Sequence, residues 1–145
     1  YRINILKTSW PMFKEFFLTG VGLGTDVFMS VVDNYKQYVN KVPVHTHVLY
    51  MQIWLEMGIM GILSFLWFIF RTVKSAVASI LEKTNVYFDN VLMAGVASLL
   101  GILSMGAVEY IWYYPRVMLF FWVDVAIVLS VLSIMRIRRN KLSEN

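Results

Sequence analysis

The sequence predicts an all-α, polytopic helical membrane protein. Hydrophobic residues make up 59% of the 145 residues, more than a soluble domain usually carries. Three apolar stretches, at about 49–70, 91–108 and 117–135, are long enough to be transmembrane helices. Residues 1–48 are less apolar, and we expect them to form an extracytoplasmic segment with an amphipathic helix and a glycine-rich loop. The membrane region would then cover residues 49–145, with a basic tail at 136–145.

Composition excludes several classes of protein. The chain has no cysteine, so disulfides and thiolate metal sites are excluded. Its net charge of +4 is too small to indicate nucleic-acid binding. The first residue is Tyr1 and no signal peptide is visible, so we expect the chain to be the C-terminal part of a longer protein.

The first twenty residues have the periodicity of an amphipathic helix at a membrane interface. Apolar side chains recur every three or four positions, at Ile3, Leu6, Trp10, Phe13 and Phe17. Pro11 is expected to kink or restart this helix. Residues 27–40 are expected to form a short surface helix, and residues 41–44 an extended segment that leads into His45.

A glycine-rich loop follows the first helix, with glycine at positions 20, 22 and 24. Backbone N–H groups in such a run can approach a phosphate, which makes Gly20, Gly22 and Gly24 candidate substrate contacts. A dinucleotide motif is not supported, because no strand precedes the loop. The alternative interpretation is a loop of tight turns without a ligand.

The two histidines of the chain, His45 and His47, stand at the entrance of the first apolar stretch. Residues 49–70 contain a single charged residue, Glu56, and a helix of this length spans roughly 33 Å, enough to cross the hydrocarbon core. Projection on a helix places Glu56 opposite His47, with Gln52 one turn above it. A carboxylate at this depth usually faces protein or a polar cavity, where it serves either function or structural hydrogen bonding.

The face of the first span that carries His47 also carries four residues that suit packing: Met51, Trp54, Gly58 and Gly61. For Met51 and Trp54 the simplest interpretation is a packing stripe. The two glycines are expected to mark the place where another helix crosses closely.

The remaining segments complete a three-span layout. Residues 71–90 are expected to form a loop with a short helix, and the second span has a small-residue face at Ala94, Ser98 and Gly101. Residues 109–116 are rich in tyrosine and tryptophan, as in an interfacial belt, and the third span contains Asp124. Lysine and arginine concentrate in 71–90 and 136–145, so the positive-inside rule places these segments in the cytoplasm. His45, His47, Glu109 and Arg116 then share the outer face.

Together these residues resemble the O-antigen ligase and polymerase superfamily. The spacing of His47, Met51, Gly58 and Gly61 is similar to its signature of a histidine followed by two glycines eleven and fourteen residues later. A wider form of the motif is matched by His45, His47, Tyr50, Gln52, Glu56, Gly58 and Gly61. Arg2 stands eighteen residues before Gly20, as the arginine of the family often does, and Phe28 follows the loop. Val48 departs from the usual Asn or Ser, and Met51 replaces the usual Leu.

The resemblance implies a metal-independent glycosyltransferase of polysaccharide or lipopolysaccharide biosynthesis, without a cofactor, in the bacterial cytoplasmic membrane. Its donor would be a glycan linked to undecaprenyl diphosphate, and its acceptor a hydroxyl of a glycan, a lipid or a protein. We expect His47 to be the general base, because histidine titrates near neutral pH. Arg2 would contact the diphosphate, which arginine binds through two parallel hydrogen bonds. Candidate substrate-binding residues are His45, Gly20, Gly22, Gly24, Gln52, Glu56 and Arg116, and no metal site is expected.

Three alternatives stay open at this point. A polymerase of repeat units would use the same donor and the same motif as a ligase. A transporter could use Glu56 and Asp124 as an intramembrane polar path. A purely structural membrane subunit is the third possibility.

Overall fold

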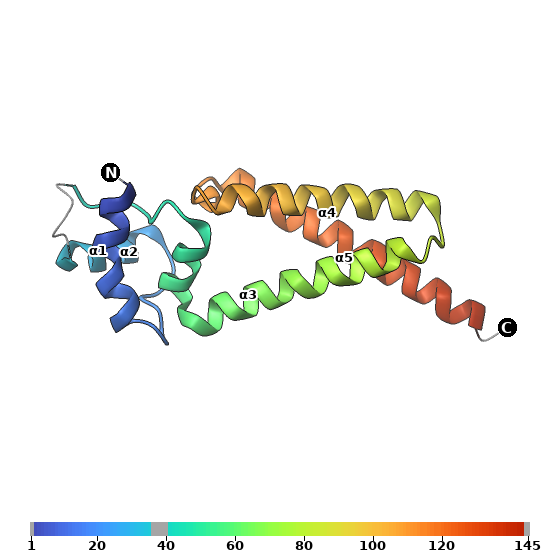
Figure 1. Cartoon of the computed structure of the whole chain (residues 1–145), viewed down its shortest axis with the longest axis horizontal. Helices are drawn as coiled ribbons and strands as arrows, with labels where there is room; N and C mark the ends of the chain where they lie inside the picture. The colour runs from blue at the N-terminus through green and yellow to red at the C-terminus, as the bar shows by residue number, and fades with distance from the viewer. Residues whose placement is uncertain (1, 36–40, 144–145) are drawn as a thin grey trace. The chain divides into compact units, whose positions relative to one another are not determined.

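The computed structural model describes residues 2–35 and 41–143, and these residues are all α-helical apart from turns and loops. The fold class predicted from the sequence is therefore confirmed. Figure 1 shows the elements in chain order, which are α1 (Arg2–Glu15), α2 (Thr25–Val32), η1 (Asp33–Tyr35), α3 (Leu49–Leu81), α4 (Val86–Gly106), η2 (Ile111–Tyr113) and α5 (Pro115–Ser143). Three of them, α3, α4 and α5, are long and apolar enough to cross a membrane. The number of spans agrees with the prediction.

The prediction that residues 71–90 form a loop with a short helix is wrong. Helix α3 continues for 33 residues to Leu81, and α4 begins at Val86. Lys83 adopts a left-handed φ of 49°, which ends α3 in the way a C-terminal cap does. Asn85 then caps α4, because its Oδ1 accepts the N–H groups of Tyr87 (3.1 Å) and Phe88 (3.2 Å). The apolar stretches mark the membrane-compatible part of these helices, whereas capping residues decide where the helices end.

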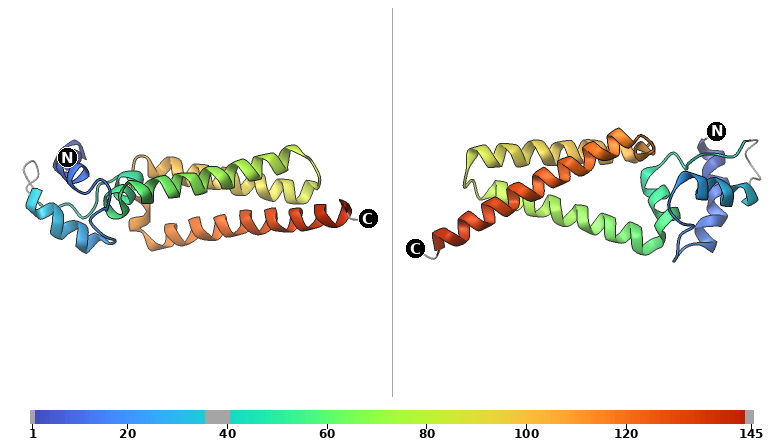
Figure 2. Two further views of the ribbon diagram at one scale, coloured as in Figure 1. Left: turned by 90° about the horizontal axis from the view of Figure 1, so that it is seen from below. Right: turned by 180° about the vertical axis from the view of Figure 1, so that it is seen from behind.

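The chain divides into two compact units, which are described separately. The first unit consists of residues 1–66 and 105–113, and the second of residues 67–104 and 114–145. In the second unit α4 and α5 approach closely at Gly95, where an added Cβ would lie 2.5 Å from Cγ2 of Val128. The predicted small-residue face makes no such contact at Gly101, where an added Cβ would meet no neighbouring segment within 4 Å in the described part of the chain. Figure 2 shows the three long helices from two further directions.

The core of the first unit joins the N-terminal helices to the start of α3. Its buried members are Met12, Phe13, Phe28, Val32 and Leu55. Trp54 packs between two rings, with its centroid 5.1 Å from Phe13 and 5.4 Å from Phe17. Met51 also packs against this core, so the packing interpretation of Met51 and Trp54 is confirmed.

Two details of the N-terminal segment differ from expectation. Helix α1 includes Pro11 without a break, and the Pro11 side chain is exposed. Helix α2 begins at Thr25, two residues before the predicted surface helix 27–40, and it ends at Val32. Residues 36–40 of that predicted helix lie outside the described residues.

Helix α3 is broken at Gly58, which has a φ of 71° and a ψ of −176°. Figure 1 shows the resulting bend near the start of α3. The break exposes backbone groups that a continuous helix would satisfy internally. The loop after α1 satisfies them instead: Ile59 donates to the carbonyl of Phe17 (2.9 Å), Val21 donates to that of Leu55 (2.7 Å) and Gly22 donates to that of Glu56 (3.1 Å).

The partner of Gly58 was predicted wrongly. A chain segment does approach it closely, since an added Cβ would lie 2.1 Å from the carbonyl oxygen of Leu18. That segment is the loop after α1 and not a crossing helix. Helical periodicity cannot foresee this contact, because it assumes that Gly58 itself is helical. Gly20 forms the other side of the same contact, with its added Cβ 2.4 Å from the carbonyl oxygen of Glu56.

Candidate functional site

The two histidines lie in a tight turn directly before α3. His47 has a left-handed φ of 60°, which is uncommon for a residue other than glycine. Its N–H donates to Nδ1 of His45 at 3.2 Å, and the N–H of Thr46 donates to Oε1 of Gln52 at 2.9 Å. Such backbone outliers persist only where surrounding contacts hold them, and they cluster at functional sites.

Gln52 and Glu56 support this turn from the first two turns of α3. The Gln52 side chain is fully buried, and its Nε2 donates to Oε1 of Glu56 at 2.9 Å. One amide therefore connects the backbone of Thr46 to the carboxylate of Glu56. Both residues lie beside the histidines, as the motif implies, but Gln52 reaches the site through Thr46 and has no exposed surface.

His47 has a partner that the sequence analysis did not assign. Its Nδ1 lies 3.0 Å from Oε1 of Glu109, although 62 residues separate the two in the chain. An ionised carboxylate only accepts hydrogen bonds, so Nδ1 carries the proton and Nε2 is the basic nitrogen of the neutral ring. Before the structure, the pairing of Glu109 with His47 could be suspected only from the predicted topology, which places both residues on the outer face.

His45 is enclosed by aromatic rings. Its ring centroid lies 4.3 Å from that of His47, 5.3 Å from that of Tyr110 and 4.9 Å from that of Tyr113. Burial lowers the pKa of His45, the nearby His47 lowers it further, and Glu109 opposes this shift. A neutral His45 fits its contact, because its Nδ1 accepts a hydrogen bond. Burial also raises the pKa of Tyr110 to about 12, so this phenol stays neutral.

The glycine-rich loop lies against α3, and four of its amides are already used. The N–H of Gly20 donates to the carbonyl of Phe16 at 2.9 Å, and those of Val21 and Gly22 donate to backbone carbonyls of α3. The N–H of Gly24 donates to the carboxylate of Glu56. A phosphate could reach these N–H groups only by replacing those bonds. Gly24 precedes α2, and an added Cβ there would meet nothing within 4 Å in the described part of the chain.

The remaining candidates are not brought together with His47 by the described contacts. Arg2 begins α1, but its side chain lies outside the part of the structure that is described. Arg116 is exposed in the first turn of α5 and belongs to the second unit. Asp124 also belongs to the second unit, and its Oδ2 is buried without a hydrogen-bond partner among the described residues.

Three side chains of the site offer donor atoms that could hold a metal ion. One ligand atom each from His45, His47 and Glu109 lies within 4.8 Å of the others. Two nitrogen atoms of this group already have hydrogen bonds, because Nδ1 of His47 faces Glu109 and Nδ1 of His45 accepts an N–H. A metal ion bound through those atoms would have to replace both contacts.

The fold and the site therefore define a helical membrane protein with a supported histidine turn at the start of a membrane-span helix. Residues 1–66 match the family model described as O-antigen ligase. This region contains the glycine-rich loop, the histidine turn and the break at Gly58, so the match covers the motifs that carry the resemblance to this family. No curated protein and no solved structure gives a match.

Proposed function

We propose that this chain forms part of a membrane glycosyltransferase of the O-antigen ligase type. It would transfer a glycan from an undecaprenyl-diphosphate donor to an acceptor hydroxyl at the outer face of the bacterial cytoplasmic membrane. The observation that carries the proposal is the contact between His47 Nδ1 and Glu109 Oε1, because it leaves Nε2 as a positioned base. The match of residues 1–66 to the ligase family supports the reaction class.

In the proposed reaction the acceptor oxygen forms a bond to the anomeric carbon while the bond to the diphosphate oxygen breaks. Nε2 of His47 takes the hydroxyl proton, and undecaprenyl diphosphate leaves with the bonding electrons. A single displacement needs one base and no enzyme nucleophile, so the anomeric configuration inverts. Arg2 is the proposed diphosphate contact, and Arg116 remains a proposed substrate contact. Gln52 and Glu56 act as positioning residues, since Gln52 holds the backbone of Thr46.

A polymerase that extends repeat units is the second candidate, because it uses the same donor and the same motif. Glycan transfer in membranes that contain the protein tests both. An undecaprenyl-diphosphate-linked repeat unit is supplied together with either a lipid A core or a second donor molecule. Transfer to the core identifies a ligase, growth of the lipid-linked chain identifies a polymerase, and the absence of both would reject the proposal.

Glu109→Gln should lower the rate of transfer about tenfold. A hydrogen bond to a charged group contributes about 1.5–3 kcal/mol, and we expect the lower end because the side chains of His47 and Glu109 are 27% and 31% exposed. Glu82→Gln is the matched control, because it removes a carboxylate from an ion pair with Arg139 in the other unit. An unchanged rate of transfer in Glu109→Gln would exclude the positioning role.

Metal removal should leave transfer unchanged, whereas added zinc should inhibit it. EDTA should have no effect, because the proposed reaction uses no metal ion. Zinc should bind His45, His47 and Glu109, whose ligand atoms lie within 4.8 Å, and this would block the base. Transfer is measured in membranes treated with EDTA, with zinc, and with zinc followed by EDTA. Loss of activity with EDTA that zinc restores would show instead that these residues hold a required metal ion.

A further inference from the structure

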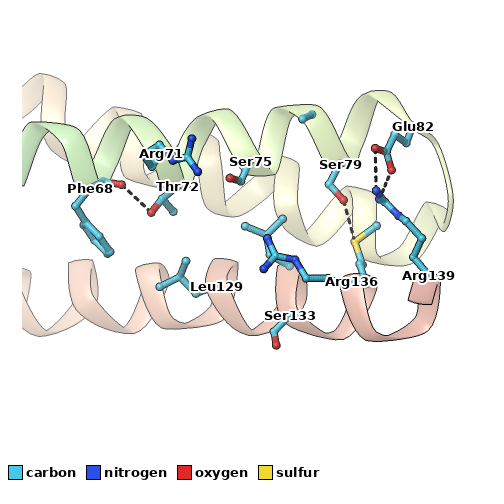
Figure 3. A pocket seen from close by; sticks show the side chains of 13 residues that line it. Phe68, Arg71, Thr72, Ser75, Ser79, Glu82, Leu129, Ser133, Arg136 and Arg139 are labelled. Carbon is cyan, nitrogen blue, oxygen red and sulfur yellow. Dashed lines mark hydrogen bonds and ion pairs between the residues drawn. The ribbon is translucent and has the colours of Figure 1, made fainter. Parts of the chain in front are cut away.

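A pocket in the second unit lies between α3 and α5. Its volume is about 520 Å³. Figure 3 shows Phe68 and Leu129 at one end and Glu82 and Arg139 at the other, with Arg136 extending from α5 into the space between the helices. The pocket is therefore lined by both apolar side chains and arginines.

The pocket has an excess of positive charge. It is lined by three arginines and one glutamate, and the glutamate is occupied because Glu82 pairs with Arg139. Within the described residues, neither Arg71 nor Arg136 is paired with a carboxylate. The guanidinium of Arg71 lies 6.0 Å from the ring of Trp67, a contact that does not neutralise its charge. Two guanidinium groups thus remain to bind an anion, and their planar shape suits phosphate.

The two unpaired arginines stand where the apolar parts of their helices end. The apolar stretch of α3 runs to Phe70 and is followed by Arg71, and that of α5 runs to Met135 and is followed by Arg136. Beyond Arg136, α5 continues with mainly charged and polar side chains, and beyond Arg71, α3 continues with polar and basic side chains among small and aliphatic ones. A phospholipid has the same layout, because its phosphate lies at the border between the hydrocarbon core and the polar region.

From this coincidence of charge and position we infer that the pocket binds an anionic phospholipid. The headgroup phosphate lies between Arg71 and Arg136, and an acyl chain lies along Phe68 and Leu129. The ion pair between Glu82 and Arg139 closes the polar end. A free phosphate ion would use the same guanidinium groups but would leave the apolar end of the pocket uncovered. The site does not depend on the transferase reaction.

The test compares lipid retention by the detergent-purified protein and its variants in native mass spectrometry. The probe is phosphatidylglycerol, offered together with phosphatidylcholine. We expect preferential retention of phosphatidylglycerol, reduced about fivefold in Arg136→Ala, which corresponds to about 1 kcal/mol per basic residue near a lipid surface. Arg136→Lys should keep part of the binding because it keeps the charge. Arg138→Ala is the matched control, since Arg138 lies on the same helix but contacts the Phe88 ring and does not line the pocket.

Three results would overturn the inference. Equal retention of phosphatidylcholine would show that charge does not select the lipid. An equal loss in Arg138→Ala and Arg136→Ala would show that the tail as a whole, and not the pocket, attracts the lipid. Full displacement of phosphatidylglycerol by inorganic phosphate would identify a soluble anion as the ligand.

Discussion

Replacing His47 with alanine should lower glycan transfer by about 10²- to 10⁴-fold, the usual effect of losing a general base. The imidazole is held by Glu109 on one side and by the turn with His45 on the other, so its Nε2 has a defined position. The protein should still insert and fold, because His47 is only partly buried and the core of the first unit contains other residues. Transfer is measured in membranes at matched expression levels.

The backbone at His47 requires a second variant. Alanine is disfavoured at a φ of 60°, so His47→Ala could lose activity through a distorted turn. His47→Gly removes the imidazole and tolerates this φ without strain. We expect both variants to lose transfer to the same extent. If His47→Gly transfers at nearly the wild-type rate, the base assignment is wrong and the role of His47 is to shape the turn.

Gly58→Ala should produce a large loss of stability in the first unit. A left-handed backbone costs a residue other than glycine about 1–3 kcal/mol, and the φ of Gly58 is 71°. The added Cβ would also lie 2.1 Å from the carbonyl oxygen of Leu18, so the loop after α1 would have to move. Overpacking of this kind costs about 1–3 kcal/mol more. The sum is a large fraction of the total stability of a typical domain, which is about 5–15 kcal/mol.

Thermal unfolding in detergent, followed by tryptophan fluorescence, measures this effect, because Trp54 packs beside the break. Gly101→Ala is the matched control. Gly101 is helical and an added Cβ there meets nothing within 4 Å in the described structure, so alanine should be neutral or stabilise by up to about 1 kcal/mol. Equal melting temperatures for the two variants would mean that the first unit does not need the loop to lie against the break.

The break at Gly58 lies in the same group of contacts that supports the histidine turn of the proposed site. The loop after α1 is attached to α3 by three backbone hydrogen bonds, and Gln52 connects α3 to the histidine turn. Gly58, Gln52 and the glycine-rich loop therefore belong to one support that ends at His47. In the proposed reaction, buried motif residues would act through this support, and for that reason Gln52 and Glu56 are assigned positioning roles.

The sequence by itself determined the properties that depend on local composition and spacing. The apolar stretches predict three membrane-span helices, because only the length and hydropathy of each segment enter that inference. The motif around His47 predicts the family that residues 1–66 match, because its residues lie within a few helical turns of one another. The packing of Met51 and Trp54 follows in the same way from their positions on one helix face.

Only the tertiary structure decided the contacts between segments that are distant in the chain. Glu109 reaches His47 across 62 residues, and no periodicity connects the two positions. Gly58 leaves the helical conformation because a loop nearly forty residues earlier supplies partners for the freed backbone groups, so a helical projection places it next to the wrong neighbour. The end of α3 at Leu81 depends on the cap at Lys83, and the start of α4 depends on the cap at Asn85. Hydropathy indicates where a helix can lie in lipid, whereas capping decides where the helix ends.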